Sequence, residues 1–186
     1  MANKDVVIKA IAETTKNLIR EKSVEKITVA EICEKTGVNP RTFYRYFKDK
    51  HEVVEWIYSN SSLTKDMHST DWSFWDYFPY IAKLLYDDRL FYRHAFQYHG
   101  QNSFRQYSIL QLSPILKKDY GTSFPDEASL NFFIEHICNM AFDSFVIWLS
   151  SDPCQEPEKF VAYFRSCFFN VSQANIRLLS DHEIKA

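Results

Sequence analysis

The chain has 186 residues, of which 46% are hydrophobic and 25% are charged, and its formal net charge at pH 7 is −2. This is ordinary globular composition, which excludes a chain dominated by disorder or by a low-complexity repeat. The three glycines, Gly37, Gly100 and Gly121, lie far apart in the sequence, so a glycine-rich nucleotide-binding loop is excluded as well.

Residues 4–22 place apolar side chains at helical spacing and predict an amphipathic helix. A second helix is predicted over residues 28–36, with the hydroxyl of its first threonine as the cap. Gly37 then allows a sharp turn, and Asn39 is typical of the N-cap of a third helix over residues 40–46. A helix, a tight glycine turn and another helix form the pattern of a helix-turn-helix.

Basic charge is concentrated around the third helix: residues 35–50 carry five Lys or Arg side chains and one acid, Asp49. Such a cluster in an otherwise acidic chain indicates a small surface that binds a polyanion. Phe43 and Phe47 are expected to hold the helix to the core, which leaves its polar residues facing outward. The alternative is a solvated basic helix without a partner.

Chemically, this surface suits duplex DNA. Arg41 can form two hydrogen bonds with a guanine, Thr42 can meet a thymine methyl group, and Lys48 and Lys50 are placed for phosphates. The residues expected to contact DNA are Thr28, Asn39, Arg41, Thr42, Tyr44, Arg45, Tyr46, Lys48 and Lys50.

The stretch TVAEICEKTGVNPRTFYRYFKDKHEVV, with its capped helix, glycine turn and TFYRYF helix, resembles the TetR family of bacterial transcriptional regulators over about residues 4–58. TFYRYFKDKHEVVEWIY and the later FYRHAFQYHGQNSF are also similar to the DhaS-like subgroup. The resemblance implies an all-helical homodimer that binds a palindromic operator on double-stranded DNA. It also implies control by a small-molecule inducer, or by a coactivator protein in the DhaS-like branch.

A fourth helix, capped by Asp49, is predicted to end near residue 57, and a polar stretch then marks a domain boundary near residue 60. Further helices are expected over residues 72–86, 89–98, 102–120, 126–151 and 157–180, separated by proline and glycine breakers. The predicted fold is all-α. Residues 1–60 form a three-helix helix-turn-helix DNA-binding domain, and residues 61–186 form a C-terminal helical effector and dimerisation domain.

The last two predicted helices are the most apolar, and pairing them with the same two from a second copy would make a four-helix dimer interface. The alternative is that both helices simply close the core of one chain. The residues predicted for the dimer interface are Phe145, Trp148, Phe160, Phe164, Phe168 and Val171.

An aromatic content of 17% suggests a ring-lined cavity as well as a packed core. A polar stripe on the helix over residues 126–151 is expected to line that cavity with rings and amides from upstream segments. The alternative is a stripe that faces solvent or is satisfied within the core. The predicted ligand-binding residues are Tyr92, Phe96, Tyr98, Asn102, Phe104, Tyr107, Phe132, His136, Asn139 and Asp143.

No metal or other cofactor is expected, since no His or Cys pair has the i, i+4 spacing of a helical zinc site. No enzyme motif is present either. The longest uninterrupted apolar run has five residues, from Phe145 to Leu149, which predicts no membrane span. The N-terminus is polar, so a cytoplasmic protein with buried free thiols is expected.

The function predicted from the sequence is a dimeric, sequence-specific DNA-binding transcriptional regulator. Its control is expected to come from a small-molecule or protein effector at the C-terminal domain. The alternative is an effector-binding or protein-interaction module whose helix-turn-helix is vestigial.

Overall fold

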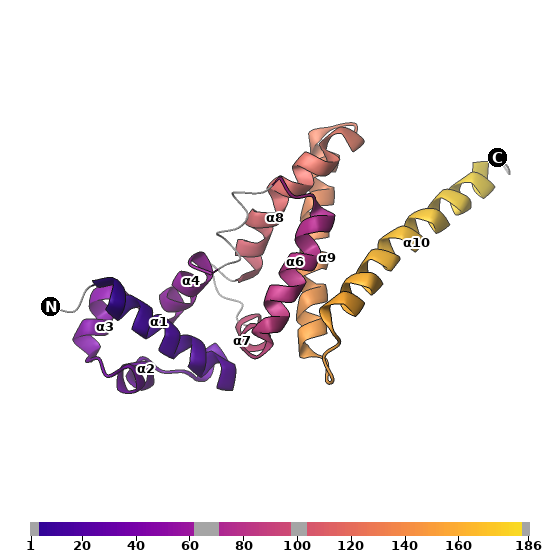
Figure 1. The fold of residues 1–186 in the computed structure, drawn as a ribbon. Helices are drawn as coiled ribbons and strands as arrows, with labels where there is room; N and C mark the ends of the chain where they lie inside the picture. The colour runs from indigo at the N-terminus through magenta and orange to yellow at the C-terminus, as the bar shows by residue number, and fades with distance from the viewer. Residues whose placement is uncertain (1–3, 62–70, 98–103, 184–186) are drawn as a thin grey trace.

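The computed structural model describes residues 4–61, 71–97 and 104–183, with side chains described up to residue 178. All regular structure in these ranges is helical, as predicted (Figure 1). The elements in chain order are α1 (Lys4–Glu21), η1 (Val24–Lys26), α2 (Val29–Thr36), α3 (Pro40–Tyr46), α4 (Lys50–Ser59), α6 (Phe74–Asp87), α7 (Arg89–Ala95), α8 (Phe104–Tyr120), η3 (Gly121–Ser123), α9 (Glu127–Ser150) and α10 (Pro157–Glu183).

Helices α1 to α4 form the N-terminal bundle, and side-chain caps set where its short helices begin. The Thr28 hydroxyl accepts from the Glu31 amide at 3.2 Å, and the Asn39 side chain accepts from the Thr42 amide at 2.8 Å. Asp49 caps α4 by accepting from two amides in its first turn. Each cap satisfies backbone donors that a helix leaves unpaired at its start.

Gly37 makes the turn between α2 and α3. It has φ +74°, and its amide bonds back to α2 while the next amide, of Val38, donates to the Cys33 carbonyl at 3.1 Å. This is a left-handed helix ending, which side chains with a Cβ adopt only with strain. The turn fixes the angle between α2 and α3 and so aims α3 outward.

We expect Gly37→Ala to destabilise the protein by about 1–2 kcal/mol, because alanine would be strained at this positive φ. Gly121→Ala is the matched control, since an added Cβ meets no atom within 4 Å at either glycine and only Gly37 has a positive φ. Urea unfolding of both variants measures the difference. Equal stability of the two variants would contradict the role assigned to the turn.

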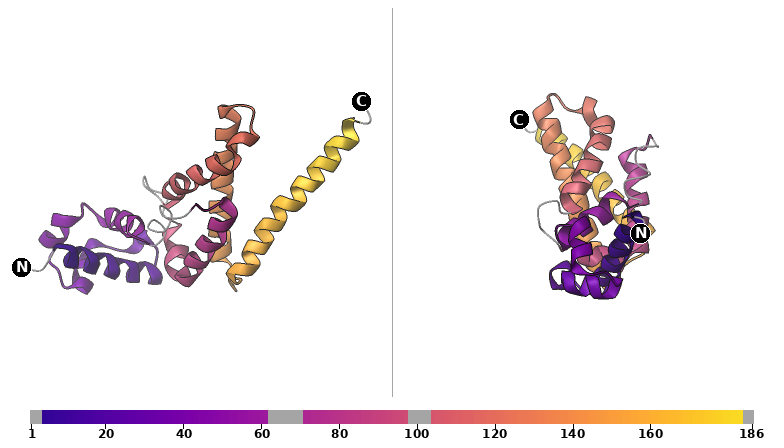
Figure 2. Two further views of the ribbon diagram at one scale, coloured as in Figure 1. Left: turned by 45° about the horizontal axis from the view of Figure 1, so that its top comes forward. Right: turned by 90° about the vertical axis from the view of Figure 1, so that its left-hand side faces the viewer.

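The C-terminal part is built on α6, α8 and α9, which pack side by side (Figure 2). Pro79 and Pro114, taken as breakers in the sequence, lie inside α6 and α8 and end neither helix. Helix α9, with 24 residues, is long and apolar enough to cross a membrane by length and composition. The sequence prediction of no such helix counted only uninterrupted apolar runs. Since α9 packs one face on α8 and α7, it serves here as a core helix.

Helix α10 has two different halves. Its N-terminal half packs on α6 through aromatic rings, with Phe78 stacked on Phe164 at 4.1 Å between centroids. Its C-terminal half projects away from the rest of the molecule (Figure 1). Cys33 and Cys138 are buried as predicted, whereas Cys167 is exposed on this helix; all four thiols are free.

The two parts of the chain meet where α1 packs on α7. Asp88, between α6 and α7, accepts two hydrogen bonds from the Arg20 guanidinium at 2.8 Å and pairs with the Lys16 ammonium at 2.8 Å. His94 Nδ1 lies 2.6 Å from the Ile19 carbonyl oxygen. Partial burial pulls the Asp88 pKa upward, but the two cations outweigh it and hold that pKa below its ordinary value. The carboxylate therefore stays charged and fastens α1 to the α6–α7 corner.

Candidate functional site

Helix α3 is the candidate DNA-reading element, and two phenylalanines fix its orientation. Phe43 is fully buried and Phe47 is nearly so, with their ring centroids 6.0 Å apart. The opposite face carries exposed Arg41, Tyr44 and Arg45. Because α3 has only seven residues, this single buried pair decides which side chains reach outward.

The basic side chains of this face are electrostatically uncompensated. Arg41, Arg45 and Lys48 are exposed, and among the described residues none of them forms an ion pair. Other cations nearby are paired, such as Lys22, whose ammonium lies 2.8 Å from the Glu31 carboxylate. Unpaired positive charge on an exposed short helix is the arrangement that phosphate and base contacts require.

The remaining predicted DNA contacts lie around this face in different roles. Thr42 and Tyr46 are half-buried, and the Thr28 and Asn39 side chains are occupied as helix caps at the exposed ends of α2 and α3. Lys50 donates to the Glu25 and Ile27 carbonyls at 2.9 and 2.8 Å. Its ammonium thus ties α4 to the segment before α2, which leaves it less free for a phosphate than Lys48.

The polar stripe expected to line a cavity does not do so, and this corrects the sequence prediction. Phe132, His136 and Asp143 are exposed, and Asn139 is half-buried. Phe132 and His136 stack on each other at 3.8 Å, while Asn139 and Asp143 accept hydrogen bonds from Arg105 on α8. The reason is the rotation of α9, which turns its other face toward α6 and α8.

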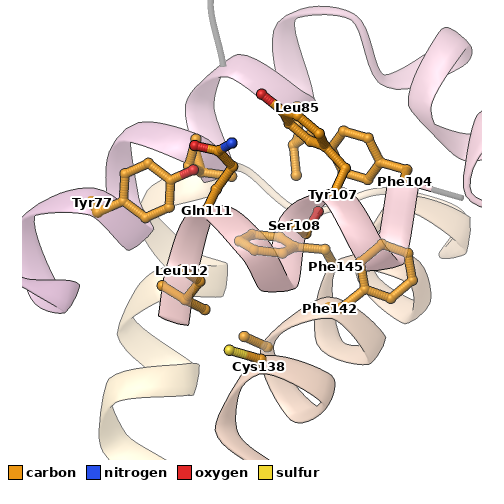
Figure 3. Close-up of a pocket in the computed structure, with 12 residues that line it drawn as sticks. Tyr77, Leu85, Phe104, Tyr107, Ser108, Gln111, Leu112, Cys138, Phe142 and Phe145 are labelled. Atoms are coloured by element: carbon orange, nitrogen blue, oxygen red, sulfur yellow. The ribbon is translucent and has the colours of Figure 1, made fainter. Parts of the chain in front are cut away.

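A cavity does exist, enclosed by α6, α8 and α9 with a volume of about 40 Å³. Of the predicted ligand-binding residues, Phe104 and Tyr107 line it, and buried Tyr92 and Phe96 pack behind Phe104 with centroids 5.8 and 4.7 Å away. Tyr98 and Asn102 lie outside the described residues. The sequence analysis missed the wall that α6 contributes. The residues lining the cavity are Tyr77, Ile81, Leu85, Phe104, Tyr107, Ser108, Gln111, Leu112, Cys138, Ala141, Phe142 and Phe145 (Figure 3).

The predicted dimer residues lie mostly within the core of their own chain. Phe145, Trp148 and Phe164 are buried, and Phe160 and Phe168 are half-buried against α6 and α9; Val171 alone of the set is 57% exposed. The sequence could not reveal that α6 supplies the partner rings. Besides Val171, other large apolar side chains on α9 and α10 are exposed: Phe132, Met140, Ile147, Tyr163, Phe169, Ile176 and Leu178.

Comparison with known proteins agrees with this geometry. Residues 11–57 match the family model described as bacterial regulatory proteins, tetR family. The HTH-type dhaKLM operon transcriptional activator DhaS of Lactococcus lactis subsp. lactis (strain IL1403) is 24% identical over 111 residues. That match covers 59% of this chain and 58% of DhaS, so it spans less than two thirds of this relative.

Solved structures share the fold over nearly the whole chain. The structure titled dihydroxyacetone kinase operon activator DhaS is 21% identical with a TM-score of 0.58, covering 93% of this chain and 97% of that one. A TetR transcriptional regulator from Streptococcus agalactiae 2603V is 19% identical with a TM-score of 0.66, covering 87% and 92%. NalD of Pseudomonas aeruginosa is 16% identical with a TM-score of 0.67, covering 90% and 97%.

An exposed basic helix on a helix-turn-helix, followed by an all-helical second part, is typical of DNA-binding transcriptional regulators. Residues 11–57 thus match the tetR-family regulatory domain, and the chain is similar to TetR-family regulators, among them DhaS. The matched relatives are transcriptional regulators rather than enzymes.

For the DNA-reading face, we expect Arg41→Ala to cost about 1–3 kcal/mol at one base position and to relax base preference there. Lys48→Ala should weaken all sequences alike and lower the salt slope by about 1, because it removes one phosphate contact. Competition titrations at two salt concentrations measure both effects. Lys83→Ala, at a 69% exposed lysine on α6, is the control. Equal losses on every sequence for Arg41→Ala would remove Arg41 from the base-reading set.

Proposed function

We propose that the protein binds a palindromic operator as a homodimer in the cytoplasm and that an effector at its C-terminal part controls this binding. The observation that carries the DNA-binding half is the uncompensated basic face of α3. The residues proposed for base contacts are Arg41, Thr42 and Tyr44, and those proposed for phosphates are Arg45 and Lys48. Lys50 is proposed to position α4 and not to contact a phosphate.

The dimer half of the proposal is supported by the exposed apolar side chains of α9 and α10. Most large apolar residues that are exposed in the described part of the chain lie on these two helices. Ile147 is 72% exposed and Ile176 is 70% exposed, the latter on the projecting half of α10. Several large exposed apolar side chains on the same two helices are typical of a protein interface. A second copy that supplies the same two helices would cover it.

Control from the C-terminal part is supported by the position of α6. Ile81 and Leu85 line the cavity, and Asp88, just beyond the end of this helix, holds α1 through Arg20 and Lys16. These three residues are four and three positions apart, so they follow one face along the helix axis. A ligand that shifts α6 would therefore move the DNA-binding helices with it. By linkage, bound DNA would lower the affinity of the protein for the ligand by the same factor as the ligand lowers its affinity for DNA.

A coactivator protein is the second candidate effector. It is favoured by the exposed Phe132 and His136, which stack on the surface of α9 instead of lining the cavity. A protein partner would use this surface, whereas a small ligand would use the cavity.

Selection of bound duplexes from a random pool tests DNA recognition and the dimer together. We expect enrichment of two inverted half-sites whose centres lie about one helical turn apart, because each protomer presents one α3 to the major groove. Enrichment of single, unrepeated sites would contradict the dimer. No salt-dependent binding to duplex DNA and no enrichment would favour a vestigial helix-turn-helix.

To test the dimer surface, we expect Ile147→Glu combined with Ile176→Glu to yield monomers in sedimentation velocity. Charges placed in a desolvated seam are strongly unfavourable. Operator affinity should then fall by roughly 10²-fold or more, since the two half-sites are no longer bound by one linked particle. Leu110→Glu is the control, because Leu110 is 71% exposed on α8. A double variant that stays dimeric would place the seam elsewhere.

A further inference from the structure

We propose that the groove between α1, α4 and α7 binds a small zwitterion with an apolar body, of which an α-amino acid with an aromatic side chain is the simplest example. The groove lies at the junction between the N-terminal bundle and the rest of the protein. It shares no residue with the cavity enclosed by α6, α8 and α9. Binding in the groove does not depend on the proposed function, whereas its consequence for operator affinity does.

The groove forms where α1 packs on both α4 and α7 (Figure 1). Its volume is about 290 Å³. Pockets that hold small molecules have volumes of roughly 300 Å³ upward, so the groove has room for a guest the size of a single amino acid. Since α1 and α4 belong to the N-terminal bundle and α7 does not, such a guest would contact both parts of the chain at once.

The floor of the groove is apolar and fixed by packing. Ile57 and Tyr58 at the end of α4, with Phe91 and Tyr92 on α7, line the groove and are each at most 8% exposed. The rings of Tyr58 and Phe91 contact each other with centroids 6.2 Å apart. Half-buried Trp56 adds a further ring. Rings and aliphatic side chains of this kind favour an apolar, preferably aromatic, body in the guest.

Two charges of opposite sign lie at the rim of the groove. Lys9 and Glu13 both line it from α1 and are exposed, and neither forms an ion pair within the described residues. They are four positions apart and therefore lie on one face of α1. A Lys that precedes a Glu by four positions is the poorer of the two orientations for an ion pair on a helix. Both charges are therefore available to a guest.

The neighbouring charged groups already have partners. The Lys16 ammonium, also at the groove, lies 2.8 Å from the Asp88 carboxylate. The Arg20 guanidinium feels the charge of Glu13 but is bound by the same Asp88 carboxylate through two hydrogen bonds. This leaves Lys9 as the cation for a carboxylate of the guest and Glu13 as the anion for its ammonium.

The two rim charges select a zwitterion over an ion. A simple anion would be attracted by Lys9 but repelled by Glu13, and a simple cation would meet the reverse. A molecule that carries both charges within one helical turn gains both attractions. Because the rim is exposed to solvent, each of the two ion pairs should change the affinity by only about twofold to fivefold.

Four probes separate the charges from the apolar body. L-Phenylalanine has both charges and a ring, 3-phenylpropanoate lacks the ammonium, phenethylamine lacks the carboxylate, and glycine lacks the ring. Each is titrated into the full-length protein labelled with ¹⁵N in its tryptophan indoles. The reporter is the Trp56 indole signal, assigned with Trp56→Phe. The Trp148 indole, which donates to the Gln155 carbonyl at 2.9 Å and does not line the groove, is the internal control.

We expect L-phenylalanine to shift the Trp56 signal saturably and to leave the Trp148 signal unchanged. Phenylpropanoate and phenethylamine should each bind about twofold to fivefold more weakly, for want of one ion pair, and glycine should not shift the signal.

Variants of the rim assign each charge to its partner. Lys9→Gln and Glu13→Gln should each weaken L-phenylalanine binding about twofold to fivefold. Lys9→Gln should not weaken phenethylamine, and Glu13→Gln should not weaken phenylpropanoate, because these probes lack the group that the lost charge attracts. Lys117→Gln and Glu127→Gln, which remove one charge of each sign from an exposed pair on α8 and α9, are the matched controls. Both should bind L-phenylalanine as wild type does.

A Trp56 signal that L-phenylalanine does not move would overturn the proposal. Equal affinity of L-phenylalanine for wild type and both rim variants would do so as well, since the rim charges would then have no part in binding. Phenylpropanoate that binds as tightly as L-phenylalanine would exclude a zwitterion site. Glycine that binds as tightly would exclude a role for the apolar floor.

Operator affinity measured with and without saturating L-phenylalanine tests the consequence for DNA binding separately. A guest that touches α1, α4 and α7 adds to the Asp88 contact, so operator affinity should change over the same concentration range that shifts the Trp56 signal. An unchanged operator affinity at saturation would refute control from this groove and leave the binding site itself standing. Failure of the free protein to bind any operator would instead contradict the proposed function.

Discussion

The contact between Asp88 and the two cations of α1 joins the DNA-binding helices to the rest of the protein. Arg20 binds this carboxylate with two parallel hydrogen bonds, and Lys16 adds a third contact. Such a bidentate arrangement fixes orientation as well as distance. The adjacent bond between His94 and the Ile19 carbonyl adds a second point of attachment on α7. Because Asp88 and His94 contact α1 at two separate points, they fix the orientation of the N-terminal bundle. A single contact would leave the bundle free to rotate about it.

Apolar packing surrounds this junction and makes it stiff. Tyr58, at the end of α4, is 2% exposed and touches both Phe91 of α7 and Phe104 of α8 at centroid distances of 6.2 and 4.9 Å. Phe104 in turn lines the cavity. The cavity and the junction are thus connected by direct contacts through a few rings and α6. A change in the position of α6 cannot be absorbed locally, because packed interiors compress little.

The parts of the fold that follow local rules were predictable from the sequence. The caps at Thr28 and Asn39, the turn at Gly37 and the buried pair on α3 depend on residues a few positions apart. The prediction that the polar stripe on α9 lines the cavity was wrong for a different reason. That helix is apolar on more than one side, and periodicity does not state which side meets α8. Contacts between residues far apart in the sequence could not be predicted either, because periodicity within one helix does not identify its neighbours.

Lys50 and Arg105 show most clearly which side-chain roles could not be predicted from the sequence. Each is an ordinary charged residue in the sequence, and each acquires its role from groups 23 or more positions away: the Glu25 and Ile27 carbonyls for Lys50, and Asn139 for Arg105. Phe164 was assigned to a dimer seam because its partner Phe78 on α6 could not be inferred from spacing. The fold class and the exposed basic face of α3 therefore follow from the sequence, whereas the cavity wall and the outer surface follow from packing.

We propose that, in a homodimer, the Asp88 junction sets the separation of the two recognition helices. Its most direct test is operator affinity measured as the spacing between half-sites is varied by one and two base pairs, in wild type and in Asp88→Asn. We expect operator affinity to depend steeply on half-site spacing in wild type and clearly less steeply in Asp88→Asn, with the affinity for a single half-site unchanged. Superimposable spacing profiles for the two proteins would contradict it.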